Sequence, residues 1–222
     1  TGAIGLIAIF LVDLINLFYI SLLGQLSVAA AVGFAGVISF FQTSLGIGLM
    51  IGIAAIVSRT VGAGRTGDAR RIATASLVLM TLVCIVVTGF SYLFLSQILD
   101  LLGATGEAKQ LATDYLIISL PSLPFLGLGM ACSALLRSVG DAKRAMNITL
   151  IGAVVTAILD PIFIFGLNLD IEGAAIATLL ARVAMAAIGI RGVLLKHRML
   201  GRFQPDAFAA DALAIGGVAA PS

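Results

Sequence analysis

The chain has 222 residues, of which 60% are hydrophobic and only 11% are charged, and its formal net charge is +2. A soluble domain carries about 25% charged residues, so this composition excludes a soluble globular protein. Together with a mean hydropathy of +1.16, it predicts an all-α membrane protein that crosses the bilayer several times. No CxxC, HExxH, Walker or GxGxxG pattern occurs, so neither soluble enzyme chemistry nor nucleic-acid binding is supported.

Six apolar segments are each long enough to cross a bilayer as a helix, which takes about twenty residues. In chain order they are residues 2–23, 28–58, 72–95, 111–136, 145–165 and 173–195. Pro121 and Pro124 are expected to bend the fourth segment. Pro161 in the fifth removes a backbone donor and frees a carbonyl one turn earlier. Such irregular backbone is tolerated only against protein or water, which favours a cavity there.

The basic residues gather on one side of the predicted helices. Eleven of the 13 Lys and Arg residues flank the second connection, the fourth connection or the end of the sixth helix: Arg59, Arg65, Arg70, Arg71, Arg137, Lys143, Arg144, Arg191, Lys196, Arg198 and Arg202. The opposite side has Lys109, and the fifth connection holds Asp170 and Glu172 without a base. The positive-inside rule therefore predicts that the eleven, and the N-terminal end of the first helix, are cytoplasmic.

A polar, basic stretch follows the sixth segment and is expected to be a cytoplasmic linker. The predicted organisation is a six-helix transmembrane lobe at 1–195, a linker at 196–207 and the truncated beginning of a second lobe at 208–222. No basic region precedes the first apolar run, so a signal peptide is not expected. Many transporters consist of two six-helix halves, and we expect this chain to be one half.

Two carboxylates lie within predicted helices, Asp13 in the first and Asp160 in the fifth. A charge at the bilayer centre costs roughly 2.5–3.5 kcal/mol on insertion scales and normally faces a protein interior or a water-filled cavity. Because burial disfavours the charged form of a carboxylate, such an acid could exchange a proton, or attract an organic cation when it is ionised. Asn16, one turn after Asp13, could orient it. The alternative for each is a hydrogen bond that only holds helices together.

Other polar residues in predicted helices carry weaker expectations. Arg182 lies inside the sixth segment, with Thr178 one turn before it on the same face. Arg182 could pair with Asp160 or Asp13, or it could face the second lobe, and the sequence does not decide between these. Gln42 falls near mid-membrane in the second segment, where a helix–helix contact is slightly favoured over a site.

Several stretches, taken in order, resemble the multidrug and toxic compound extrusion (MATE) transporters over nearly the whole chain. They are Asp13 with Leu22 to Ala30, Gly46-Ile47-Gly48 with Val57-Ser58-Arg59 and Gly62-Ala63-Gly64, Arg137 with Gly140 to Lys143, Ile158 to Pro161 with Phe165-Gly166, and Glu172 to Thr178. The resemblance implies a twelve-helix, two-lobe antiporter of which this chain is the N-terminal lobe. An acid at position 160 is similar to the DinF-like branch, which is generally proton-coupled. Thr156 departs from the Asn that this branch often has there.

The resulting expectation is a secondary active antiporter, not an enzyme, that exports hydrophobic or cationic organic compounds in exchange for H⁺ or Na⁺. Its residues would be Asp13, Asn16, Gln42, Thr156, Asp160, Thr178 and Arg182. No cofactor and no resident metal are expected, although Na⁺ could bind at Asp13 or Asp160. Expected partners are small organic substrates, H⁺ or Na⁺, membrane lipid and the second lobe, in a bacterial or archaeal inner membrane.

Three alternatives remain open. A lipid-linked oligosaccharide flippase of the same superfamily would need a larger basic cavity, and Arg182 is compatible with one. A non-transporting receptor or assembly subunit would make Asp13 and Asp160 dispensable. An intramembrane enzyme would need a clustered catalytic set, which the sequence does not display.

Overall fold

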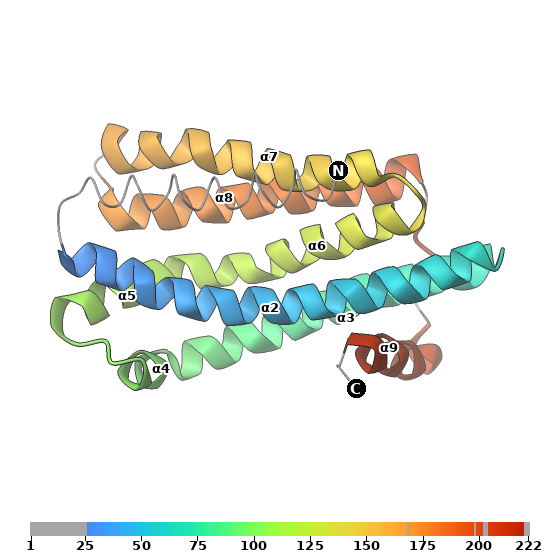
Figure 1. The fold of residues 1–222 in the computed structure, drawn as a ribbon, viewed down its shortest axis with the longest axis horizontal. Helices are drawn as coiled ribbons and strands as arrows, with labels where there is room; N and C mark the ends of the chain where they lie inside the picture. The colour runs from blue at the N-terminus through green and yellow to red at the C-terminus, as the bar shows by residue number, and fades with distance from the viewer. Residues whose placement is uncertain (1–25, 168, 198, 202–203, 220–222) are drawn as a thin grey trace.

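The computed structural model describes residues 26–167, 169–197, 199–201 and 204–219, and over these ranges the chain is helical apart from short connections (Figure 1). The elements in order are α2 (Leu26–Gly62), α3 (Thr66–Leu93), α4 (Leu95–Leu101), α5 (Gly106–Ser119), η1 (Leu120–Ser122), α6 (Leu123–Ser138), α7 (Ala142–Pro161), η2 (Ile162–Gly166), α8 (Asp170–Arg191), η3 (Gly192–Lys196) and α9 (Pro205–Ala219). The predicted first helix, residues 2–23, lies outside the described residues.

Five helices in the described part of the chain are long and apolar enough to cross a membrane: Ser27–Gly62, Thr66–Leu93, Gly106–Ser138, Ala142–Ile164 and Asp170–Lys196. They match the second to sixth predicted segments, and successive spans run in opposite directions along the bundle (Figure 1). The expectation of an all-α membrane fold is therefore confirmed, while the predicted boundaries are a few residues short at several ends.

Two clusters of buried apolar side chains hold the bundle together. One contains Ile53 of α2, Met80 of α3, Leu135 of α6 and Ile148 of α7. The other joins α2, α4, α5 and the start of α8. Large apolar side chains also point outward, as in the case of Phe40, which is 70% exposed. Since lipid is as apolar as these side chains, an outward apolar surface is what a membrane-spanning bundle requires.

Prolines interrupt the fourth predicted segment as expected. α5 ends at Ser119, the 3₁₀ turn η1 follows, and α6 begins at Leu123. Pro121 lies in η1 and Pro124 in the first turn of α6, positions where a missing backbone N–H is tolerated. The predicted bend is thus built as a short 3₁₀ segment between two α-helices.

One local element was not predicted and one local prediction is wrong. No helix is predicted between the third and fourth segments, whereas the structure has the short helix α4 there, whose Leu99 is fully buried against the second cluster. Asp170 and Glu172 were expected in a connection, but they form the first turn of α8. Acidic side chains are favourable at a helix N-terminus because the helix dipole is positive there, so Asp170 and Glu172 stabilise the start of α8.

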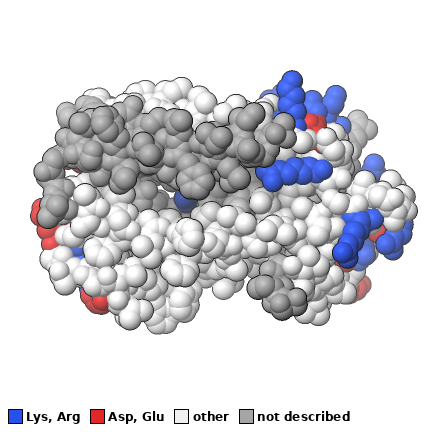
Figure 2. Space-filling view, in the orientation of Figure 1, with Lys and Arg blue, Asp and Glu red and all other residues white. Residues whose placement is uncertain are grey.

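The charged residues separate between the two ends of the bundle. Figure 2 shows Lys and Arg side chains crowded at the end where α2 meets α3 and α6 meets α7. At the opposite end Lys109 of α5 forms an ion pair with Asp100 of α4. The connection from α6 to α7 turns at Gly140, whose φ of 81° is a conformation that favours glycine. The structure therefore gathers the basic connections of the described chain at one end; that this end is cytoplasmic stays a prediction.

Candidate functional site

Asp160 is the charged side chain buried most deeply within a described membrane-spanning segment. It lies in the last turn of α7 and is only 1% exposed. Its Oδ1 atom has no hydrogen-bond partner among the described residues, and no ion pair to Asp160 occurs there either. A buried polar atom without a partner is costly. The site thus contains an oxygen that a proton or a cation would stabilise.

The backbone around Asp160 is irregular for a reason visible in the sequence. Pro161 follows directly and has no N–H, so the carbonyl of Ala157 receives no hydrogen bond from its usual helical donor. The helix then widens into the π turn η2, in which the N–H of Leu167 donates to the carbonyl of Ile162 at 3.0 Å. π turns are frequent at functional sites. The prediction of irregular backbone beside Asp160 is confirmed.

α8 lies very close to this irregular segment because Gly173 has no side chain. A Cβ atom at position 173 would lie 2.8 Å from the carbonyl carbon of Phe163 and 2.9 Å from its oxygen. That oxygen already accepts a hydrogen bond of 3.1 Å from the N–H of Leu169. The backbone just after Asp160 is therefore held firmly against α8 by contact with Gly173.

The other expected site residues do not gather around Asp160 through direct hydrogen bonds. Thr156 lies one turn before Asp160, but its hydroxyl donates to the carbonyl of Gly152 at 3.1 Å. Thr178 of α8 is half-buried. Asp13 and Asn16 lie outside the described residues, so their expected roles stay predictions.

Gln42 has a partner of its own in the core. Its Nε2 donates to Ser91 Oγ at 2.9 Å, which joins the middle of α2 to α3. The adjoining cavity, lined by Gln42, Gly46, Cys84 and Leu123 among others, has a volume of about 10 Å³, room for about one water molecule. These contacts favour the helix–helix role of Gln42 over a role in a site.

Arg182 contacts the proline-induced break between α5 and α6. Its Nη1 donates to Ser122 Oγ at 2.7 Å, and the Ser122 hydroxyl donates in turn to the carbonyl of Ser119. Arg182 does not form an ion pair with Asp160, which removes one of the two pairings considered. Its guanidinium group therefore lies at mid-bundle, on the 3₁₀ turn.

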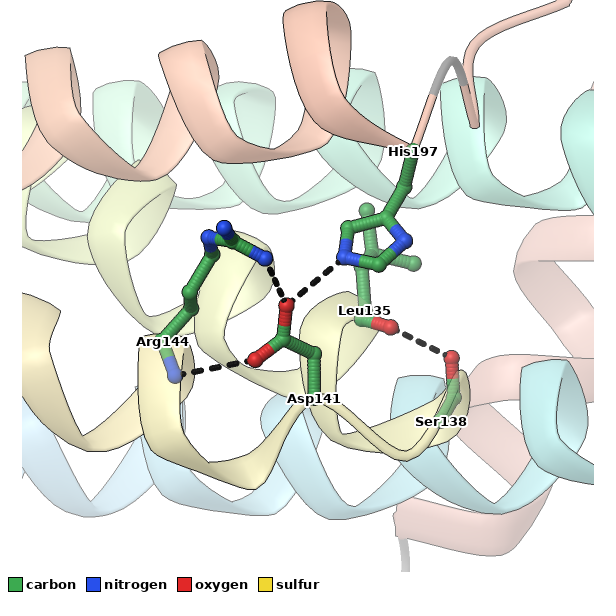
Figure 3. A network of polar contacts seen from close by, with 5 residues as sticks. All are labelled: Leu135, Ser138, Asp141, Arg144 and His197. Atoms are coloured by element: carbon green, nitrogen blue, oxygen red, sulfur yellow. Dashed lines mark hydrogen bonds and ion pairs between the residues drawn. The ribbon is translucent and has the colours of Figure 1, made fainter.

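A polar network that sequence reasoning missed lies at the basic end of the bundle (Figure 3). Asp141 caps α7 by accepting a hydrogen bond of 3.1 Å from the backbone N–H of Arg144. It also contacts the guanidinium group of Arg144, and it lies 2.8 Å from Nε2 of His197. The hydrogen bond with His197, followed by that with Arg144, lowers the pKa of Asp141 from 3.8 to about 2. An Asp after Gly140 is a recognisable helix cap, but its pairing with His197 depends on tertiary structure.

The segment after α8 is attached to the same end. Gly201 and Thr74 of α3 exchange two hydrogen bonds, of 3.0 and 3.1 Å. Asp211 of α9 forms an ion pair of 3.0 Å with Arg71 of α3, and α9 packs against α2 and α3 (Figure 1). The predicted linker thus contacts the helical bundle closely in its described parts.

Comparison with known proteins identifies relatives of one kind. The family model MatE matches residues 3–162. A FAD transporter from Shewanella oneidensis is 30% identical over 99% of this chain and 50% of its own length. The multidrug export protein MepA from Staphylococcus aureus is 29% identical over 82% of this chain and 41% of its own length.

Solved structures agree with these matches. The MATE transporter VcmN from Vibrio cholerae, in its bent form, has a TM-score of 0.90 and 26% identity over 97% of this chain and 49% of its own. A MOP superfamily transporter from Pyrococcus furiosus, described as having a binding pocket of reversed polarity, has a TM-score of 0.88 and 27% identity over 97% and 48%. The chain therefore spans about half the length of the proteins it matches.

Proposed function

The chain belongs to the MatE family, and we propose that it forms one lobe of a secondary active antiporter that exports organic compounds in exchange for H⁺ or Na⁺. Residues 1–195 would form the lobe, 196–207 the linker, and 208–222 the start of the second lobe. The named relatives support transport of organic compounds, since one is a FAD transporter, and the multidrug export protein supports export. The basic end of the bundle would face the cytoplasm, with the N-terminus on that side. The assignment to the DinF-like branch stays a prediction.

The observation that carries this proposal is the buried Asp160, whose Oδ1 has no hydrogen-bond partner within the part of the chain that the structure describes. An ionised carboxylate only accepts hydrogen bonds, whereas a protonated one also donates. Asp160 would therefore be most stable here with a proton or cation bound, and least stable when it is ionised and in contact with neither water nor a cation. An antiporter needs such a group, because the bound ion must leave when the cavity opens to the other side.

A proton fits the described residues better than a metal ion. A proton needs one carboxylate oxygen, whereas hard cations are bound by several oxygens. No group of three or more His, Cys, Asp or Glu side chains lies together among the described residues. The hydroxyl of Thr156 and the carbonyl of Ala157 could add oxygens near Asp160, so Na⁺ remains the alternative that the experiment tests.

Two substrate classes are candidates, organic cations and organic anions. A carboxylate such as Asp160 favours a cationic compound of the kind expected from the sequence. Arg182, whose guanidinium lies at mid-bundle against Ser122, favours an anionic one, and the FAD transporter is named for a substrate that carries phosphates. Arginine recognises phosphate by charge-assisted hydrogen bonds. A phosphate-bearing substrate, including the lipid-linked oligosaccharide of the flippase alternative, is therefore the second candidate.

Replacement of Asp160 tests the coupling proposal. Asp160→Asn keeps the size of the side chain and removes its ability to ionise. We expect it to lower the initial rate of efflux driven by an imposed pH gradient by about tenfold or more, which corresponds to roughly 1.4 kcal/mol in the barrier. Asp114→Asn is the matched control, because Asp114 is an exposed acid on α5. Unchanged efflux in Asp160→Asn, or efflux in the unmodified protein that follows only a sodium gradient, would contradict proton coupling at Asp160.

Replacement of Arg182 tests the substrate class. If the substrate carries phosphate, Arg182→Gln should reduce transport of a flavin dinucleotide and leave transport of a lipophilic cation intact, whereas Arg182→Lys should keep part of both. If the substrate is a cation, Arg182→Gln should leave its transport unchanged or increase it. Equal losses for both compounds would mean that Arg182 only supports the break between α5 and α6.

A further inference from the structure

A groove opens at the basic end of the bundle, between α6, α7 and the end of α8 with η3. Its volume is about 400 Å³. Four polar side chains lie along it, from Arg144 and Asn147 in the first two turns of α7 and from Arg191 and Lys196 at the end of α8 and η3. Figure 2 shows the Lys and Arg side chains collected at this end of the molecule.

The positive charge at this groove is only partly compensated. Arg144 shares Asp141 with His197. Arg191 and Lys196 are exposed and form no ion pair with a described residue. Among the described residues, one acid thus faces three bases and a histidine, so the groove attracts anions.

The rest of the groove is apolar. Ile148 and Ile151 line it from α7, Ile188 from α8 and Leu195 from η3. Leu195 is 70% exposed. A free inorganic anion would leave this apolar part of the groove in contact with water, whereas an amphiphile would cover it.

The same face of α7 continues into the membrane. Val154 and Ile158 follow Ile151 at spacings of three and four residues, which places them on one face of a helix. They are 49% and 55% exposed. Ile158 is seven residues beyond Ile151, about 10 Å along the helix, so a continuous apolar track runs from the basic groove into the hydrocarbon layer.

We propose that this groove binds an anionic phospholipid, with the phosphate between Arg191, Lys196 and Arg144 and an acyl chain along Ile151, Val154 and Ile158. The groove lies where the spans Ala142–Ile164 and Asp170–Lys196 begin and end, which is the depth at which lipid head groups meet a membrane protein. Basic pockets between helices on the cytoplasmic side are suited to such head groups. This proposal does not depend on which compound the protein transports.

Lipid binding to the purified full-length protein in detergent tests the proposal. The probe is a spin-labelled phosphatidylglycerol, compared with a phosphatidylcholine of the same chain length. The groove variant is Arg191→Gln with Lys196→Gln. The control variant is Arg65→Gln with Arg70→Gln, which removes two exposed charges from the same end of the bundle, one from the α2–α3 connection and one from the start of α3. Size-exclusion profiles and circular dichroism establish that both variants are folded.

We expect tighter binding of phosphatidylglycerol than of phosphatidylcholine, and an affinity loss of about fivefold per removed charge in the groove variant alone. Equal losses in the two variants would overturn the proposal in favour of a diffuse surface effect. Equal binding of the two lipids would also overturn it, because no head group would be recognised. Displacement of the labelled lipid by inorganic phosphate or glycerol phosphate at similar concentrations would show a site for a soluble anion instead.

Discussion

Gly173→Ala should destabilise the protein, although alanine is normally the better helix former. Gly173 lies in the first turns of α8, where a Cβ atom would approach the Phe163 carbonyl group to 2.8 and 2.9 Å. These are backbone atoms, so they cannot rotate away as the end of a flexible side chain can. Moving the Phe163 carbonyl would also disturb the hydrogen bond that it accepts from Leu169.

The expected size follows from two opposing effects. Overpacking a close contact costs about 1–3 kcal/mol, whereas replacing glycine by alanine in a helix gains up to about 1 kcal/mol. The net loss should be about 1–2 kcal/mol, which lowers the melting temperature of a chain of this length by about 2–8 °C. Gly89→Ala on α3 is the control, because nothing lies within 4 Å of the added Cβ there, so it should be neutral or stabilising.

Thermal unfolding of the two variants in the same detergent measures this difference. The variant Gly173→Ala should melt below the unmodified protein and Gly89→Ala at or above it. Efflux should fall in Gly173→Ala even below its melting temperature, since the segment that follows Asp160 must shift. A melting temperature of Gly173→Ala that equals or exceeds that of Gly89→Ala would refute the close approach of α8 to η2.

Three other predictions follow from described contacts. Asp141→Asn should lower the melting temperature at pH 5. The difference in melting temperature should disappear as the pH falls from about 4 to 2, because the pKa of Asp141 is lowered in the folded protein and its stabilising contribution is lost when the acid becomes protonated. A difference that persists at pH 2 would mean that packing, and not the charge, is responsible. Gln42→Leu should leave the Ser91 hydroxyl unsatisfied and cost about 1–3 kcal/mol, more than the double change with Ser91→Ala. An impermeant thiol reagent added outside intact cells should label Glu172→Cys and not Lys143→Cys; the reverse pattern would invert the orientation.

The sequence was sufficient for the helices because long apolar runs have few alternatives in a membrane. Pro121 and Pro161 marked the places where regular hydrogen bonding had to fail, and both positions are irregular in the structure. The short helix α4 was missed because its seven residues have no periodicity long enough to detect; it is stabilised by burying Leu99 against the second cluster. Local sequence patterns therefore predicted the long helices and the proline-induced irregularities, which depend on backbone hydrogen bonding.

The partners of polar side chains were less predictable. The sequence allows Arg182 to pair with Asp160, whereas in the structure Arg182 donates a hydrogen bond to Ser122, sixty residues away, and forms no ion pair with Asp160. His197 falls in the predicted linker at 196–207, where no partner is predicted for it, and it contacts Asp141 across fifty-six residues. Such contacts depend on the rotation and tilt of whole helices, which composition and spacing do not determine.

The contrast between Gln42 and Asp160 is the strongest physical argument for a functional acid on α7. Both are polar side chains buried in membrane-spanning helices. Gln42 has a neutral partner in Ser91 on the neighbouring helix, which is the arrangement that a purely structural polar residue needs. Asp160 has an oxygen without any such partner among the described residues, and it precedes a proline that leaves a second acceptor, the carbonyl of Ala157, without its helical donor. The ionised form of Asp160 is disfavoured by an oxygen that has no donor among the described residues and is stabilised when a proton or cation binds, so the polar residue to test for coupling is Asp160 rather than Gln42.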